Sequence, residues 1–204
     1  NCKDVFLSTM LNIVVLIYSK KGSTLQLAEE ICKGIDSVNN VKAKLRRVDE
    51  LKQTQQLRML EKYENVQVIT KRDITDCHGL ILGSPTRFGN MAAELKYFID
   101  QTLDIWISGE LIGKPGAVFT STSSLHGGQE TTLLSMMLPL FHHGMLLSGI
   151  PYSEPYLSET KTGGTPYGAS HVSMNKKESI LSNEEKDLGF AMGARVAKIA
   201  SKLS

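Results

Sequence analysis

The stretch NIVVLIYSKKGSTLQLA, residues 12–28, decides the fold. Its unbroken apolar run, Ile13 to Tyr18, predicts a strand buried on both faces, which is typical of the centre of a parallel sheet covered by helices. Apolar residues then recur at helical spacing, at Leu27, Ala28, Ile31 and Ile35. Strand, loop and helix in this order place the loop at the carboxyl end of a central strand, where open α/β sheets bind anionic ligands.

The loop after this strand suits a phosphate. Backbone N–H groups at a helix start have no partner within their own helix, and the helix dipole adds partial positive charge. Gly22 lets the backbone approach a ligand closely, and Ser19, Ser23 and Thr24 add hydroxyl groups. The loop contains neither GxxxxGK[ST] nor GxGxxG. The alternative is an ordinary capping box, with Ser23 as the cap and Gln26 three residues later.

Composition limits the partners of the chain. The 204 residues are 41% hydrophobic and 22% charged, which fits one globular domain with a substantial core. Lys and Arg number 23 against 21 Asp and Glu, so the net charge is only +2. There is also no long basic run, and we therefore expect no nucleic-acid partner.

The cysteines and the N-terminus give further expectations. Cys2, Cys32 and Cys77 are far apart and form no CxxC or Cys/His cluster, so we expect no disulfide framework and no metal site. A reducing, cytoplasmic location is the simplest compartment. The apolar run is too short to span a membrane, so no membrane insertion is expected. Residues 1–9 are expected to be an extension, with residues 10–204 forming the domain.

The rest of the chain alternates strands and helices. Further strands are predicted at residues 41–48, 78–83, 115–120 and 145–150, and helices at 95–103, 131–142 and from 182. Pro139 is expected to kink its helix or end it early, and Ser182 with Glu185 forms a capping box. Residues 49–72 and 153–181 read as long surface segments that are hard to pack within one subunit. Five strands in this order predict a doubly wound α/β sheet.

Three of these strands end in loops rich in Gly, Ser and Thr, at residues 19–24, 84–90 and 121–129. In a parallel sheet such loops lie along one edge. Their convergence predicts a ligand-binding crevice there.

Longer motifs make the prediction specific. They are GSPTRFGN at 83–90, FIDQT at 98–102, Trp106, GGQE at 127–130, HHGM at 142–145 and GGTPYGA at 163–169. With these motifs the chain, from about Met10 onward, resembles the WrbA-type NAD(P)H:quinone oxidoreductases of the flavodoxin-like superfamily.

The resemblance implies a flavodoxin-like, five-stranded parallel sheet in the order 2-1-3-4-5 with helices on both faces. It also implies FMN as cofactor, NADH or NADPH as electron donor, a quinone as substrate and a homotetramer. The residues that it assigns to FMN are Ser19, Lys20, Lys21, Gly22, Ser23, Thr24, Pro85, Thr86, Arg87, Phe88, Gly89, Asn90, Ser121, Thr122, Ser123, Ser124, Leu125, His126, Gly127 and His142.

The resemblance also assigns two catalytic residues. Trp106 would wall the space over the flavin, and His142 would reach the active site of the tetramer and handle a proton. On the residues alone, Trp106 can equally be a core aromatic, and His142 with His143 can simply end a helix. Likewise, Lys20 and Lys21 can form a solvated turn, and His126 can be a solvent-facing variation.

The chain departs from the family pattern at two places. Lys21 stands where the family commonly has an aromatic residue, and it cannot stack on a ring, although it can attract the phosphates of NAD(P)H. The 121–126 loop is longer and less glycine-rich than usual. The predicted function is two-electron reduction of quinones through flavin N5 with ping-pong kinetics. The alternatives are a flavodoxin-like electron carrier and an FMN-binding regulatory protein.

Overall fold

A single parallel sheet forms the centre of the protein. The computed structural model describes residues 10–51, 61–174 and 180–204, so the expectation for residues 1–9 lies outside the described part. Strands follow the order β2-β1-β3-β4-β5, with β6 also paired to β4, and every pairing is parallel. The predicted flavodoxin-like order is therefore confirmed. The strands are β1 (Leu11–Ile17), β2 (Val41–Arg47), β3 (Gly79–Pro85), β4 (Pro115–Thr122), β5 (Leu146–Leu147) and β6 (Ala169–Val172).

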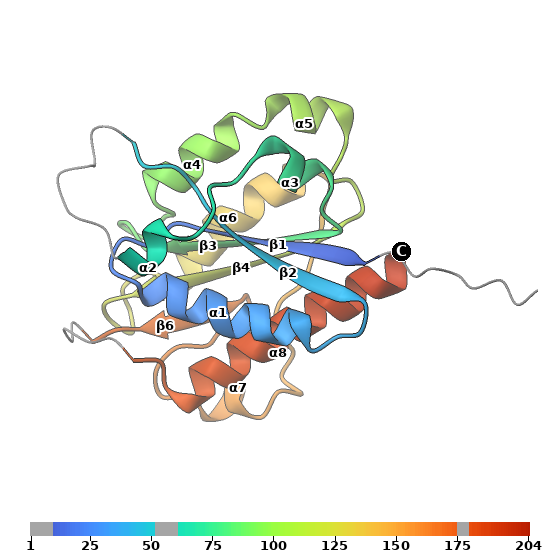
Figure 1. Cartoon of the computed structure of the whole chain (residues 1–204). Helices are drawn as coiled ribbons and strands as arrows, with labels where there is room; N and C mark the ends of the chain where they lie inside the picture. Colours follow the sequence, from blue (N-terminus) through green and yellow to red (C-terminus); the bar gives the residue numbers. More distant parts are fainter. Residues whose placement is uncertain (1–9, 52–60, 175–179) are drawn as a thin grey trace, which may run out of the picture.

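Helices cover both faces of this sheet (Figure 1). In that view α1 and α8 lie below the sheet, and α4, α5 and α6 lie above it. The helices are α1 (Ser23–Asp36), α2 (Glu61–Glu64), α3 (Lys71–Thr75), α4 (Ala93–Asp100), α5 (Leu103–Ser108), α6 (Gln129–His142), α7 (Tyr156–Glu159) and α8 (Asn183–Leu203). Because both faces are covered, residues 13–17 of β1 are fully buried, as the apolar run predicted.

The edge beside β4 differs from the prediction. The fifth strand predicted at residues 145–150 is present but shorter, because β5 has only two residues, which pair with Pro115 and Gly116 at the start of β4. The chain then leaves the sheet and returns as β6, which pairs with Phe119–Thr122 at the end of β4. Two segments thus share one edge. The 169–172 part of the long segment packs within the subunit, contrary to expectation, and all four residues of β6 are buried.

The helix ends follow local chemistry. The Ser182–Glu185 capping box of α8 is present, as predicted. Pro139 does not end α6 early, since the helix continues to His142 and the N–H of His143 donates to the Pro139 carbonyl at 3.0 Å.

In the 49–72 segment, residues 52–60 lie outside the described part, but Tyr63 of α2 is fully buried. Within the described residues, no helix is long and apolar enough to cross a membrane.

Helices α1 and α8 lie side by side (Figure 1) at very close range. A Cβ atom on Gly34 of α1 would meet the Phe190 carbonyl oxygen at 2.0 Å, and one on Gly193 of α8 would meet the Ile31 carbonyl oxygen at 2.1 Å. Only glycine fits at these two crossings. The backbone contact fixes α1, and with it the loop that precedes α1, against the end of the chain.

Candidate functional site

The three predicted loops do converge at the carboxyl edge of the sheet. They line a cavity of about 320 Å³. Its walls come from the loop after β1, the end of β3, the end of β4 and the residue that follows β6. The lining residues are Ser19, Lys20, Lys21, Ser23, Thr24, Pro85, Thr86, Arg87, Ser121, Thr122, Ser123 and Ser173. Eleven of these twelve are among the predicted FMN-binding residues, and Ser173 is new.

The loop before α1 presents unpaired backbone donors to this cavity. Gly22 is the N-cap of α1 with φ of 90°, a left-handed conformation that glycine adopts without strain. The Ser19 hydroxyl accepts from the Leu25 N–H at 3.1 Å. The four amides from residue 21 to residue 24 have no acceptor among the described residues. The proposed Ser23–Gln26 capping box is wrong, because the N-cap residue of α1 is Gly22, which has no side chain.

Hydroxyl groups connect this loop to β4 and β3. The Thr24 and Ser121 hydroxyls lie 2.8 Å apart, and both side chains are buried. The Thr86 N–H donates to the Ser121 carbonyl at 2.9 Å, and the Thr86 hydroxyl lies 2.7 Å from that of Thr132 on α6. These bonds hold the three walls in fixed positions, so the cavity is formed before any ligand arrives.

The PTRFGN segment folds into a tight turn at the cavity rim. The Arg87 N–H donates to the Asn90 carbonyl at 2.7 Å, and the Asn90 N–H donates back to the Arg87 carbonyl at 3.1 Å. Phe88 has φ of 52° and its side chain is fully exposed. A bulky residue in this region of backbone conformation is strained, and such strain concentrates at functional sites. Phe88, Gly89 and Asn90 do not line the 320 Å³ cavity.

The third loop divides into two parts. Ser121 and Thr122 belong to β4 rather than to a loop, and with Ser123 they line the cavity. The next four residues do not line it. They are Ser124, Leu125 and His126, which are exposed, and Gly127, which is partly buried. Their assignment to FMN remains a prediction.

Ser173 reaches the cavity because β6 completes the sheet edge. Its N–H donates to the Thr122 carbonyl at 2.9 Å, directly beyond the last pair of β4 and β6. No strong signal in the sequence pointed to Ser173, since ASHV at residues 169–172 has two polar residues and lies in a segment rich in Gly, Ser and Thr.

A buried polar cluster anchors β6. The His171 Nδ1 lies 2.7 Å from the Glu185 Oε2, and both side chains are about 1% exposed. The other Glu185 oxygen accepts from the Gly163 and Val172 N–H groups, each at 2.9 Å. Burial alone would raise the pKa of Glu185, but the hydrogen bonds from His171, Val172 and Ser182 outweigh it and hold the pKa below its ordinary value.

The two predicted catalytic residues lie elsewhere. Trp106 and His142 line a second groove, of about 600 Å³, between α4, α5 and α6, and it shares no lining residue with the first cavity. Trp106 is half exposed, so the core-aromatic alternative is wrong. Its indole N–H donates to the His142 carbonyl at 2.8 Å.

His143, the neighbour of His142, is the more buried of the two histidines. His143 Nε2 lies 2.9 Å from the Thr102 hydroxyl, whereas its Nδ1 is buried without a partner among the described residues. Burial, reinforced by the charge of His142, lowers the pKa of His143 below its ordinary value. His142 itself is exposed at the end of α6.

Comparisons with known proteins agree with this architecture. The family model described as NADPH-dependent FMN reductase matches residues 11–153. The NAD(P)H dehydrogenase (quinone) of Trichlorobacter lovleyi is 38% identical over 96% of this chain and 100% of its own length. The enzyme of the same name from Solidesulfovibrio magneticus is 36% identical over 95% of this chain and 99% of its own.

Solved structures agree at the level of the fold. A flavodoxin, WrbA-like protein from Agrobacterium tumefaciens superposes with a TM-score of 0.69 at 23% identity, covering 95% of this chain and 99% of its own. The family model and the two relatives align with nearly the whole described sheet, including the loop between β1 and α1. The chain therefore belongs to the NADPH-dependent FMN reductase family.

Proposed function

We propose that this protein binds FMN in the 320 Å³ cavity and uses NADH or NADPH to reduce quinones to hydroquinones by two electrons. One observation carries the proposal. Four amides at the start of α1, from residue 21 to residue 24, have no acceptor among the described residues, and three of these four residues line a cavity that lies next to three hydroxyl-bearing strand ends. Such a helix start binds phosphate, and the sequence relatives carry the name NAD(P)H dehydrogenase (quinone).

The residues present fit FMN. Its phosphate needs donors, which the amides and the hydroxyls of Ser19, Ser23 and Thr24 supply. The polar edge of its ring needs hydrogen-bonding groups, and Thr86 and Ser121 hold such groups at fixed positions. Pro85 offers an apolar wall, and no carboxylate lines the cavity within the described part of the chain. An anionic ligand with one polar and one apolar end thus finds a matching surface.

The role that we propose for the protein chain is to position the cofactor and the substrates. When bound, FMN would supply two-electron, hydride-level redox chemistry between a nicotinamide donor and a quinone, in alternate, ping-pong half-reactions. The loop after β1 would hold the phosphate end, while the PTRFGN turn would set the rim against which the ring lies. We assign to His142 the transfer of a proton to the quinone oxygen, because histidine is the side chain that most often acts as a general acid or base.

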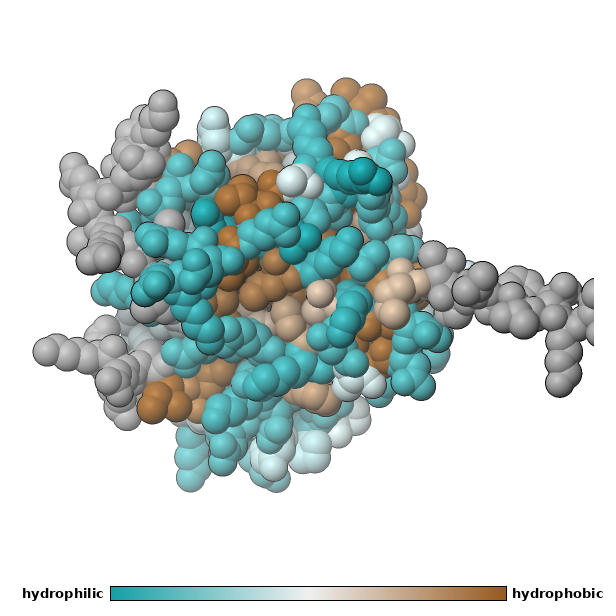
Figure 2. Space-filling model, viewed as in Figure 1, coloured by the Kyte–Doolittle hydropathy of each residue, from teal (hydrophilic) through white to brown (hydrophobic). Residues whose placement is uncertain are grey.

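We further propose that the chain assembles as a homotetramer. The supporting observation is the α5–α6 face, which we define as Leu103, Trp106, Ile107, Leu138 and Phe141. Each of these side chains is at least half exposed, and Figure 2 shows hydrophobic atoms along the α5 edge. An apolar face of this kind marks an interaction site, and a second copy is the occupant that we assign to it. Assembly would let His142 of one subunit serve the flavin of another.

The two alternative functions differ in what they require. A flavodoxin-like carrier exchanges single electrons with a protein partner and is usually steered by strong acidity, whereas this chain carries +2. An FMN-binding regulatory protein would keep the flavin without turnover. The quinone reductase is favoured because its named relatives match almost end to end. We propose a cytoplasmic location, since no described cysteine pair forms a disulfide.

Visible spectroscopy under nitrogen tests the function. After FMN is added and the excess removed, we expect flavin bands that bleach with NADPH or NADH and return with benzoquinone. Bands that stay unbleached would favour a carrier or a regulatory protein. A protein without flavin bands would refute FMN binding itself. The Gly22→Val variant is the matched control, because it should lose the bands while the protein remains folded.

A further inference from the structure

The cavity proposed for FMN has a surplus of positive charge. Lys20, Lys21 and Arg87 all line it, and none of the other described lining residues is charged. The FMN phosphate carries close to two negative charges at neutral pH, as phosphate monoesters do. Unpaired amides and hydroxyls already supply its donors, as helix starts do without any lysine. The cations therefore exceed what one phosphate requires.

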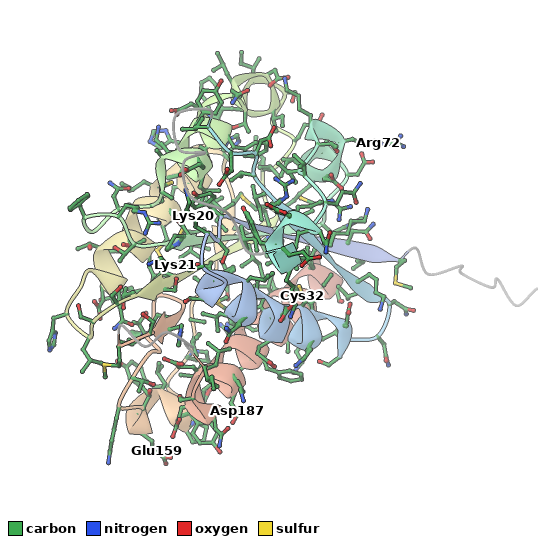
Figure 3. All side chains as sticks on the ribbon, turned by 60° about the vertical axis from the view of Figure 1, so that its left-hand side comes forward. Lys20, Lys21, Cys32, Arg72, Glu159 and Asp187 are labelled. Atoms are coloured by element: carbon green, nitrogen blue, oxygen red, sulfur yellow. The ribbon has the colours of Figure 1, made fainter. Side chains whose placement is uncertain are left out.

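Lys21 is the cation that is most available for a second anion. Its side chain is exposed while still lining the cavity, and no ion pair joins it to any residue that the structure describes. Figure 3 places Lys20 and Lys21 together at the start of α1, at the carboxyl edge of the sheet. Lysines elsewhere on the surface, such as Lys33, Lys62 and Lys71, are paired with carboxylates instead.

Arg87 supplies a second positive charge at the mouth from a different loop. Its guanidinium is exposed, and its Nη1 donates to the Thr86 carbonyl at 3.0 Å, which limits the directions in which it can point. A guanidinium and an ammonium on the two loops of one opening form a binding site for phosphate oxygens.

We propose that Lys21, with Arg87, binds the phosphate groups of the nicotinamide dinucleotide and so makes Lys21 a specificity residue for the donor half-reaction. This inference rests on the proposed function, because donor and quinone use the same opening in turn. Of the two substrates only the donor carries phosphates. A simple quinone such as benzoquinone is neutral and gains nothing from Lys21. Loss of the Lys21 charge should therefore weaken binding of the donor and leave binding of the quinone at the same site unchanged.

Titration calorimetry of the FMN-loaded protein with NADP⁺ and NAD⁺ tests this. Neither probe reduces the flavin, so binding is recorded whether or not turnover occurs. At about 0.01 M ionic strength, where the Debye length is about 30 Å, we expect Lys21→Gln to weaken NADP⁺ binding about fivefold and Lys21→Glu more. At about 1 M the difference should vanish. Lys21→Arg should retain binding.

The matched control is Lys198→Gln, which removes the same charge from an exposed position near the far end of α8. An equal loss for NADP⁺ and NAD⁺ would support contact with the shared pyrophosphate, and a loss for NADP⁺ alone would support contact with the 2′-phosphate. The proposal is overturned if Lys21→Gln changes binding no more than Lys198→Gln does. It is also overturned if Lys21→Gln releases FMN, because Lys21 would then serve the flavin phosphate. Failure of NADPH to bleach the wild-type flavin would instead refute the proposed function.

Discussion

The crevice at the carboxyl edge of the sheet and the α5–α6 face are built in opposite ways. The crevice consists of backbone amides, short hydroxyl side chains and cations, held by hydrogen bonds between three loops. The α5–α6 face consists of large apolar side chains that are at least half exposed. The described lining of the first comes from one chain, whereas the second leaves apolar surface in water. The difference teaches that the surface we propose for a small anion and the surface we propose for a second copy are separate, so single substitutions can address each of them alone.

The largest expected effect comes from a charge placed on the apolar face. Leu138→Glu would bury an unpaired carboxylate between subunits, which costs several kcal/mol. We therefore expect dissociation into smaller species at micromolar protein, with association weakened about a thousandfold or more. Sedimentation velocity measures this.

Leu203→Glu is the matched control for that variant, since Leu203 is similarly exposed at the end of α8. Leu203→Glu should leave the mass of the assembly in solution unchanged. A wild-type protein that sediments as a monomer would contradict the proposal that a second copy covers the α5–α6 face. The crevice would then be the only one of the two surfaces with a proposed ligand.

A smaller effect is expected from the anchor of β6. Glu185→Gln removes the charge of a buried pair and should lower the free energy of unfolding by about 3 kcal/mol. It should also weaken FMN binding, because β6 positions Ser173 in the crevice. Assembly through α5 and α6 should persist. Urea denaturation, flavin titration and sedimentation measure the three properties.

The same variant should change the pH dependence of stability. The folded-state pKa of Glu185 lies below its unfolded value, so its contribution is present above the unfolded pKa and is lost as the pH falls through the folded pKa. The wild-type protein should therefore lose more stability on the acid side than Glu185→Gln. Asp187→Asn, at an exposed position two residues further along α8, serves as control and should behave like the wild type. An equal acid loss in all three proteins would contradict the anchoring role.

The smallest of the three effects concerns the backbone of the crevice. Gly22→Val places a β-branched residue at φ of 90°, which costs about 2 kcal/mol, so FMN binding should weaken about thirtyfold. Gly113→Val is the matched control, because Gly113 has φ of 75° with open space around it and lies at the amino end of β4, opposite the crevice. It should lose stability but keep its FMN affinity. Equal FMN loss in both would mean that strain acts through the whole fold.

Sequence reasoning succeeded where one physical signal dominated. The apolar run of β1 allowed only a central strand, and the change to helical spacing after Gly22 located the cavity. It failed at β6, because Ser170 and His171 look like loop residues. They are buried only because Gln129 and Glu185, distant in the sequence, supply hydrogen-bond partners. It could not show that Trp106 lies in a different groove from Lys21, since that follows from packing and not from spacing.

The contact between α1 and α8 has a consequence for the folding rate. The backbone surface around Gly34 faces Phe190 and Ala194, so it is covered only when α8 docks on α1. The two helices are far apart in the sequence, and contacts of high sequence separation slow folding because a long loop of chain must close first. Until α8 has docked, this face of α1 is exposed to chaperones and proteases.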